Sequence, residues 1–213
     1  MYRRIATLAL CSLLAACAAK APSRVVLVST VAVEEPAAWR TSITPDDAAR
    51  LDNLAADWNR LHARLSPRVR SAQGKLVDPD AGLDMPAVSP GSYRCRVLRL
   101  RTPARGPATV RASTSDFCFV SSTADGIAFV KQTGSDPTAG YFHPDGDHYV
   151  FLGARQRRAG DNSIGYGNEP ARDMIGVVER VGGFRWRLAV AGTAPGQLDI
   201  YELTPVPSEQ QPG

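Results

Sequence analysis

Phe184-Arg185-Trp186-Arg187-Leu188-Ala189-Val190 is the stretch that decides the fold, because large apolar side chains occupy every second position. Successive side chains of a β-strand point to opposite faces, so this alternation predicts a half-buried strand. The side chains expected to face the core are Phe184, Trp186, Leu188 and Val190, whereas Arg185 and Arg187 are expected to face water. The glycine pair 182–183 and the apolar run 174–181 precede it, which predicts an antiparallel hairpin.

Short apolar or alternating runs of this kind recur from Tyr93 to the C-terminal region and are separated by turn residues. The predicted strands lie near residues 92–101, 116–122, 126–132, 139–143, 147–153, 174–181, 184–190 and 197–204. Turn signals at 124–126 and 144–147 agree with this division. Eight strands in a meander favour a curved sheet or a small barrel, whose interior holds either packed side chains or one small ligand.

A helix is predicted to begin at Thr44-Pro45-Asp46-Asp47 and to run to about Leu65, where Ser66-Pro67 ends it. Its apolar residues fall on one stripe at spacings of three and four: Leu51, Leu54, Trp58, Leu61 and Leu65. A coiled-coil seam is the alternative, but the stripe lasts only about two heptads, so packing on the sheet is favoured. Residues 68–90 predict a loop-rich crossing with one helical turn. The predicted fold class is α+β and mostly antiparallel β, with an N-terminal helix packed on a curved meander sheet or an eight-stranded barrel-like domain.

The N-terminal residues are typical of a secretion signal, with Arg3 and Arg4 before an apolar run. Leu14-Ala15-Ala16-Cys17 is similar to a bacterial lipobox and predicts lipidation of Cys17; the alternative is an ordinary secreted protein cut after Ala16. Ala18 after that cysteine favours the outer membrane. We therefore expect a lipid-anchored envelope protein facing the periplasm, with a signal peptide at 1–16, a lipidated tether at 17–40, one globular domain at 41–205 and a tail at 206–213.

Two cysteines, Cys95 and Cys118, remain once Cys11 leaves with the signal and Cys17 is lipidated. An oxidising compartment predicts a disulfide between them, whereas a reactive or metal-binding pair lacks a Cys-x-x-Cys spacing and a nearby histidine. The formal charge falls from +4 to +2 when Arg3 and Arg4 are removed. This nearly balanced charge argues against a nucleic-acid partner.

The chain resembles an uncharacterised family of bacterial envelope proteins, the domain of unknown function DUF4893, over about residues 39–205. The motifs that carry the resemblance are Trp39-Arg40, Thr44-Pro45-Asp46, Gly91-Ser92-Tyr93-Arg94-Cys95-Arg96, Phe151-Leu152-Gly153, Tyr166-Gly167, Arg172-Asp173-Met174-Ile175-Gly176, Glu179-Arg180, Arg185-Trp186-Arg187-Leu188 and Leu198-Asp199-Ile200-Tyr201-Glu202-Leu203. The resemblance implies an envelope location and brings no activity, cofactor or site residues.

His143-Pro144-Asp145-Gly146-Asp147-His148 is the most site-like motif. In a hairpin with a four-residue turn, 144–147, the two histidines would face each other and could share a divalent metal with an aspartate. The alternative is a polar surface turn, which needs no metal, and third and fourth ligands are not evident. We therefore predict no metal and no cofactor, with His143 and His148 as weak candidate ligands.

Arginines are the second site candidate, because several could converge on one face of the sheet. The residues proposed to bind an anion, such as a carboxylate or phosphate of an envelope glycan or lipid, are Arg94, Arg96, Arg185 and Arg187. The alternative is a solvated strand face on which nearby acidic residues pair with them.

Three functions remain open from the sequence. The favoured one is a non-enzymatic envelope lipoprotein that binds a protein or envelope component. The second is a carrier of a small apolar ligand, in a barrel lined by residues such as Phe119, Phe129, Phe151 and Trp186. The least favoured is a hydrolase of envelope polymers, since no Gly-x-Ser-x-Gly elbow, no His-Glu-x-x-His and no free mature cysteine supports an enzyme.

Overall fold

The computed structural model describes residues 37–210. The predicted signal peptide, Cys17, most of the predicted tether and residues 211–213 lie outside this range. The helical elements are η1 (Ala38–Thr41), α1 (Pro45–Asp52), α2 (Leu54–Ala63), α3 (Pro67–Gln73), η2 (Gly74–Leu76), η3 (Pro79–Ala81), η4 (Pro170–Arg172) and η5 (Ser208–Gln210). The strands are β1 (Gly91–Arg101), β2 (Thr109–Ala112), β3 (Asp116–Thr123), β4 (Gly126–Lys131), β5 (Thr138–Asp145), β6 (His148–Arg155), β7 (Asp173–Gly182), β8 (Arg185–Ala191) and β9 (Gln197–Pro205).

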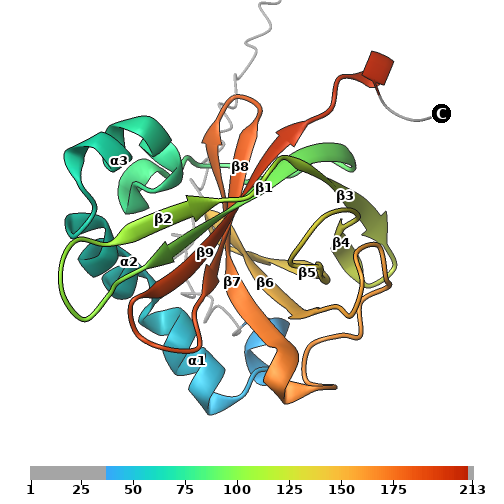
Figure 1. Cartoon of the computed structure of the whole chain (residues 1–213). Helices are drawn as coiled ribbons and strands as arrows, with labels where there is room; N and C mark the ends of the chain where they lie inside the picture. The colour runs from blue at the N-terminus through green and yellow to red at the C-terminus, as the bar shows by residue number, and fades with distance from the viewer. Residues whose placement is uncertain (1–36, 211–213) are drawn as a thin grey trace, which may run out of the picture. The chain divides into compact units, whose positions relative to one another are not determined.

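Eight strands form a closed antiparallel barrel in the order β1-β3-β4-β5-β6-β7-β8-β9, and the pairing of β1 with β9 closes it (Figure 1). Of the two predicted forms, a curved meander sheet and an eight-stranded barrel, the structure has the barrel, and the predicted α+β, mostly antiparallel β class is confirmed. Closure satisfies the hydrogen-bonding groups that an open sheet would leave along its edges. A ninth strand, β2, was not predicted; it pairs with residues 98–101 of β1, while β3 pairs with residues 91–95 on the same side.

The barrel interior is packed with side chains from all around the wall. Phe129 stacks on Phe142 with ring centroids 5.5 Å apart, and Phe151 and Tyr201 meet Phe129 edge-on. The other members of this buried cluster include Tyr93, Cys95, Val97, Cys118, Val120, Met174, Val178, Trp186, Leu188, Val190 and Leu203. Apolar burial of this extent favours a packed core over an open ligand cavity.

A second apolar cluster lies outside the barrel, where the helices cover part of its wall. The predicted stripe packs there: Leu54, Trp58, Leu61 and Leu65 are buried, and Leu51 packs against them. They meet outward-facing residues of the strands, including Leu98, Ile175, Ala189 and Ile200. This arrangement confirms that the stripe packs on the protein's own sheet. Trp39, which lies within the predicted tether, is also buried in this layer.

The predicted single helix is in fact two, α1 and α2, which meet at Asn53. Thr44 caps the first as expected, because its Oγ1 accepts a hydrogen bond from the amide of Asp47 at 3.2 Å. The Asn53 side chain donates to the carbonyl of Ala49 at 2.7 Å and so competes with the helical backbone bonds. Helix α2 ends at Ala63, and Ser66 caps α3, which is longer than the single turn predicted for this region.

Two expectations for the stretch 184–190 are wrong. Phe184 does not face the core but lies 79% exposed in the turn before β8, which begins at Arg185. Arg187 does not face water and is fully buried. The outer face of β8 lies under the helical layer, so outward-facing side chains of this strand are covered as well. Trp186, Leu188 and Val190 face the interior as predicted.

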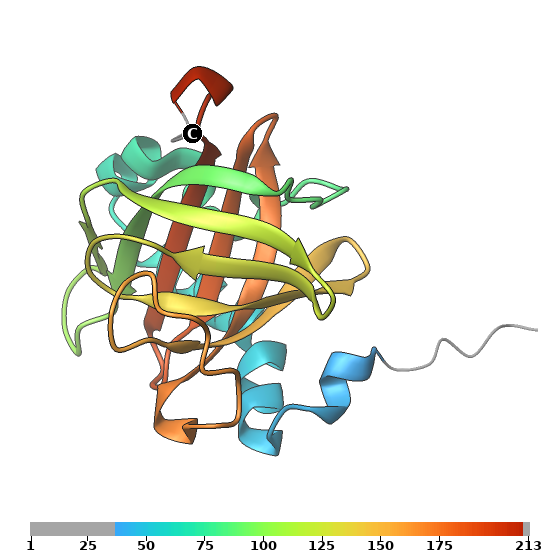
Figure 2. The ribbon, with the colours of Figure 1, turned by 90° about the vertical axis from the view of Figure 1, so that its right-hand side faces the viewer.

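The connections alternate between the two ends of the barrel, as they must in a meander. We call one end the strap end: it carries the β3–β4, β5–β6 and β7–β8 hairpins together with the segment 83–90, which we call the strap. The opposite end carries the β4–β5, β6–β7 and β8–β9 connections, and we call it the loop end. Figure 2 shows the β7–β8 hairpin projecting at the top, far from the β6–β7 loop.

Candidate functional site

The strap is an irregular segment that closes one end of the barrel. Three side chains of the barrel hold its carbonyl groups. Trp186 Nε1 donates to Pro86 at 2.9 Å, Tyr93 Oη donates to Ser89 at 2.6 Å and Arg180 Nη2 donates to Asp84 at 2.8 Å. Burial raises the pKa of Tyr93 to about 12, so its hydroxyl remains a donor at neutral pH.

The strap also joins the barrel through its backbone and one core residue. The amide of Leu83 donates to the carbonyl of Arg180 at 2.8 Å, in an isolated antiparallel bridge. Val88 is 4% exposed and packs in the interior cluster. The strap therefore covers the core at this end, and its remaining side chains face outward.

Two of the large apolar side chains that folding leaves exposed, Met85 and Phe184, lie on the strap groove described below. Within residues 37–210, the exposed large hydrophobic residues are Leu83, Met85, Phe119 and Phe184. Leu83 and Met85 belong to the strap, Phe184 to the β7–β8 turn, and Phe119 pairs with Ser92 near the start of β1. Met85 and Phe184 are 73% and 79% exposed. Exposed apolar side chains that lie side by side, as Met85 and Phe184 do, are typical of an interaction surface.

Met85 has a backbone φ of 56°. A non-glycine side chain is disfavoured in this left-handed region, and the conformation costs of order 1 kcal/mol or more. The structure therefore holds a strained residue whose apolar side chain points to water rather than to the core. Strain of this kind is concentrated at functional sites.

A groove of about 440 Å³ lies between the strap and the β7–β8 hairpin, and we call it the strap groove. Its lining includes Met85, Tyr93, Arg180, Phe184, Trp186 and Pro205. Arg180 is the cation of this lining. Its Nε atom is buried without a hydrogen-bond partner, and among the described residues no carboxylate lies within ion-pair distance of it.

A second groove, of about 320 Å³, lies between α2, η3 and the β5–β6 hairpin, and we call it the acidic groove. Its lining includes Trp58, Asp52, Asp80, Asp145, His148 and Glu179. Two of these carboxylates already have partners within the chain. Asp145 pairs with Arg40 at 3.3 Å, and Glu179 pairs with Arg187 at 2.7 Å. The groove has a negative lining that attracts cations, without a preformed constellation for catalysis.

The two histidines of the site-like motif are not brought together as expected. The β5–β6 turn consists of Gly146 and Asp147 rather than four residues, so His143 pairs with Val150 and His148 with Asp145. His148 Nδ1 lies 2.9 Å from Asp147 Oδ1, and burial lowers the pKa of His143. Over residues 37–210, no group of three or more His, Cys, Asp or Glu side chains is placed to hold a metal ion.

Two of the four arginines proposed for anion binding lie on one charged row that crosses four strands, and a third, Arg185, joins the row through Glu202. In register, Arg96 of β1 faces Glu202 of β9, Glu202 faces Arg187 of β8, and Arg187 faces Glu179 of β7. Arg96 and Arg185 both bind Glu202, the latter at 2.6 Å. The chain's own carboxylates thus occupy the positions that a ligand anion would take.

Arg94, the fourth of these arginines, is exposed and lies apart from the charged row. Its guanidinium is 4.1 Å from the centroid of the Phe117 ring. In the described part of the chain it has no acidic partner. Arg94 therefore adds positive charge near the start of β1, next to the strap end.

The residues proposed to line a ligand-holding barrel divide into two groups. Phe129, Phe151 and Trp186 are interior, as expected, but they pack against one another and their neighbours. Phe119 lies on the outside and is 37% exposed, because the alternation of β3 turns Cys118 and Val120 inward. The disulfide predicted between Cys95 and Cys118 is present, with the sulfur atoms 2.06 Å apart.

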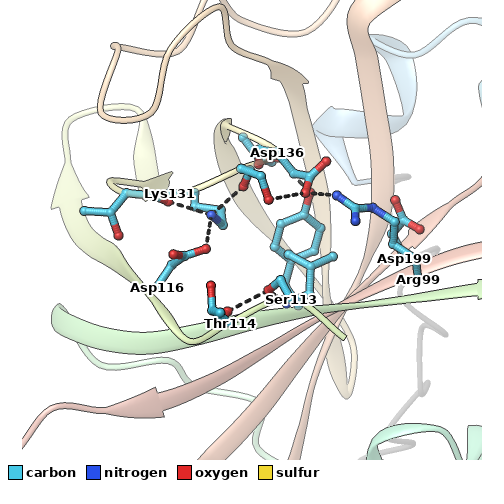
Figure 3. A network of polar contacts seen from close by, with 12 residues as sticks. Arg99, Ser113, Thr114, Asp116, Lys131, Asp136 and Asp199 are labelled. Atoms are coloured by element: carbon cyan, nitrogen blue, oxygen red, sulfur yellow. Dashed lines mark hydrogen bonds and ion pairs between the residues drawn. The ribbon is translucent and has the colours of Figure 1, made fainter. Parts of the chain in front are cut away.

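A buried lysine at the loop end was not predicted. The ammonium of Lys131 lies between Asp116 and the β4–β5 loop, as Figure 3 shows. Lys131 Nζ binds Asp116 at 2.7 Å and the carbonyl groups of Thr133 and Ser135 at 2.6 and 2.5 Å. Asp136 of the same loop forms an ion pair with Arg99. These contacts are all internal, so the network fastens the loop across this end of the barrel.

The whole described domain is similar to one family of proteins. A family described as a domain of unknown function, DUF4893, matches residues 39–203. The chain belongs to the DUF4893 family. The match spans the domain from Trp39 through most of β9. No match is found among curated proteins or solved structures. Within residues 37–210, none of the helices is long and apolar enough to cross a bilayer.

Proposed function

We propose that this DUF4893 protein is a non-enzymatic, lipid-anchored protein of the bacterial envelope that binds a protein or envelope component through its strap end. The lipobox-like sequence at residues 14–17 supports the anchor. The Cys95–Cys118 disulfide supports export to an oxidising compartment, because cytosolic proteins rarely keep such bonds.

The observation that carries the binding proposal is the exposure of Met85 and Phe184 on the strap groove. Burying Met85 and Phe184 against a partner would remove from water two side chains that folding leaves 73% and 79% exposed. Aromatic, methionine and arginine side chains are enriched at the centres of protein interfaces. The strap groove combines Phe184, Trp186, Met85 and Arg180.

The packed interior argues against the carrier hypothesis in its original form. Phe129, Phe142 and Phe151 contact one another where a ligand would lie. A ligand would therefore bind on the outer surface of the barrel end rather than within the barrel.

Site-specific photo-crosslinking in intact cells tests the proposal. A photo-reactive amino acid replaces Phe184 in one variant and Arg157, which is 78% exposed at the loop end, in a matched control. We expect a discrete crosslinked product from position 184 and none from position 157. Equal crosslinking from both positions, or none from position 184, would contradict a binding surface at the strap end.

A further inference from the structure

We infer that the strap groove binds a single-chain anionic amphiphile, with the apolar chain between Met85 and Phe184 and the anionic head at Arg180. This inference rests on the proposed function, because it names the class of envelope component that the strap end binds. The ligand chemistry is an unbranched alkyl or acyl chain that ends in a carboxylate or phosphate. A free fatty acid supplies it with a carboxylate, and a single-chain lysophospholipid supplies it with a phosphate.

The walls of the groove account for the apolar chain. Met85 and Phe184 flank it, and Tyr93, Trp186 and Pro205 contribute to its lining. The polar atoms of Tyr93 and Trp186 already donate to strap carbonyl groups, so these rings offer their apolar surfaces. A volume of about 440 Å³ lies within the usual range for small-molecule sites.

Arg180 accounts for the anionic head. Its guanidinium donates one hydrogen bond to a carbonyl group, and within residues 37–210 no carboxylate pairs with it. A cation in a partly buried, apolar setting is stabilised by an anion that supplies both charge and acceptor atoms. The other buried or half-buried arginines of the barrel, such as Arg187 and Arg96, have such a carboxylate within the chain.

The charges around the strap end favour one amphiphile molecule over a flat anionic membrane surface. Arg180 lines the strap groove, and Arg94 and Arg185 directly follow the lining residues Tyr93 and Phe184. Acidic residues occupy the strap and the two neighbouring hairpins of the same end: Asp84, Asp125, Asp145 and Asp147. A membrane lying across the whole end would meet these carboxylates, whereas the lining of the strap groove contains no carboxylate side chain.

Titration calorimetry tests the inference on the full chain carrying Cys17→Ala, which removes the proposed anchor as a competing ligand. The probes are decyl phosphate and decanoate below their micelle-forming concentrations, with neutral decyl maltoside and cationic decyltrimethylammonium as comparisons. We expect both anions to bind with one-to-one stoichiometry. We expect the neutral probe to bind at least about tenfold more weakly, because it cannot form the hydrogen-bonded ion pair with Arg180. We expect the cation not to bind, because Arg180 repels it.

Three variants locate the site. Arg180→Gln is expected to weaken decyl phosphate binding about tenfold and to abolish the preference over decyl maltoside. Phe184→Ser is expected to weaken all chain-bearing probes, and because this side chain is 79% exposed the fold does not depend on it. Arg157→Gln, an exposed arginine at the loop end, is the matched control and should leave binding unchanged.

Vesicles that contain phosphatidylglycerol test the other occupant of the strap end, a membrane of two-chain phospholipids. Binding of free decyl phosphate with loss in Arg180→Gln supports the inference, whether or not vesicles also bind. Binding that is equal for anionic and neutral probes, that survives Arg180→Gln, or that occurs only on vesicles would overturn it. If the inference fails in this way, a protein crosslinked from position 184 would still support the proposed function. The absence of any crosslink from position 184 would contradict the proposed function as well.

Discussion

The guanidinium of Arg187 lies 4.2 Å from the centroid of the Trp58 ring and joins the barrel wall to the helical layer. It binds Glu179 at 2.7 Å and donates to the carbonyl groups of Lys75 and Pro79 at 2.7 and 3.1 Å. Burial lowers the pKa of Arg187, while the carboxylate of Glu179 opposes that shift. One side chain thus organises η2 and η3 against β8.

Replacing Arg187 should therefore destabilise the fold strongly. Arg187→Met leaves Glu179 and several carbonyl groups without their donor, and we expect the free energy of unfolding to fall by about 3 kcal/mol or more. Arg185→Met, at a half-exposed position of the same strand, should cost below about 1 kcal/mol. Urea unfolding of both variants measures this difference. Equal losses in the free energy of unfolding would contradict a larger structural role for the buried Arg187 than for Arg185.

Stability should fall at alkaline pH, because burial raises the pKa of Tyr201 to about 12. The unfolded chain releases this phenolic proton near pH 10, so the contribution is complete below pH 10 and is lost as the pH rises through 12. From this residue alone, the loss at pH 11 is on the order of 1 kcal/mol. Urea unfolding at pH 9 and pH 11 should show a smaller decline for Tyr201→Phe than for the natural chain. Identical declines would contradict the prediction.

Removing the disulfide should lower stability through the unfolded chain. Cys95 and Cys118 close a loop with a sequence separation of 23 residues, for which the chain-entropy model gives about 3 kcal/mol. We expect the double variant Cys95→Ala with Cys118→Ala to lose at least this amount in chemical denaturation. Thiol labelling of the native, unreduced protein should modify neither cysteine. Labelling of both would show that the bond does not form.

Gly140 and Gly153 face each other across β5 and β6 at a position where the strands leave no room for a side chain. A Cβ atom at Gly140 would lie 2.4 Å from the carbonyl oxygen of Leu152 and 2.5 Å from the Gly153 Cα, both backbone atoms. We expect Gly140→Ala to cost about 3 kcal/mol or more. Gly183→Ala, which meets nothing within 4 Å, should be nearly neutral in thermal unfolding. A loss in stability for Gly140→Ala as small as that for Gly183→Ala would contradict the close approach of β5 and β6 at this position.

Much of the barrel could be predicted because alternation is a local property. The stretch 184–190 predicts a strand and identifies Trp186, Leu188 and Val190 as interior. The same alternation cannot reveal that helices cover the outer face of β8, and for this reason it places Arg187 in water. Strand β2 has four residues and little alternation, so its pairing depends on β1 rather than on its own sequence.

The candidate site was harder to predict, because its residues come together only through the tertiary fold. Met85 and Phe184 lie in turn-rich segments without periodicity, and nothing local indicates that they meet across a groove. In the histidine motif, two residues that are close in the sequence were expected to meet and do not. A turn of two residues rather than four changes the register, so that His143 does not face His148. Pairing of Arg96 and Arg185 with Glu202 likewise depends on register.

Oxidation of Met85 in intact cells tests the central claim, a covered strap end, and does not require that the partner be identified. Met85 is 73% exposed in the described domain, whereas Met174 is 6% exposed and serves as the buried internal control. Mass spectrometry after brief peroxide treatment compares cells with the purified chain. We predict rapid sulfoxide formation at Met85 in the purified chain and clear protection in cells, with Met174 slow in both. Equal oxidation of Met85 in the two samples would contradict the claim.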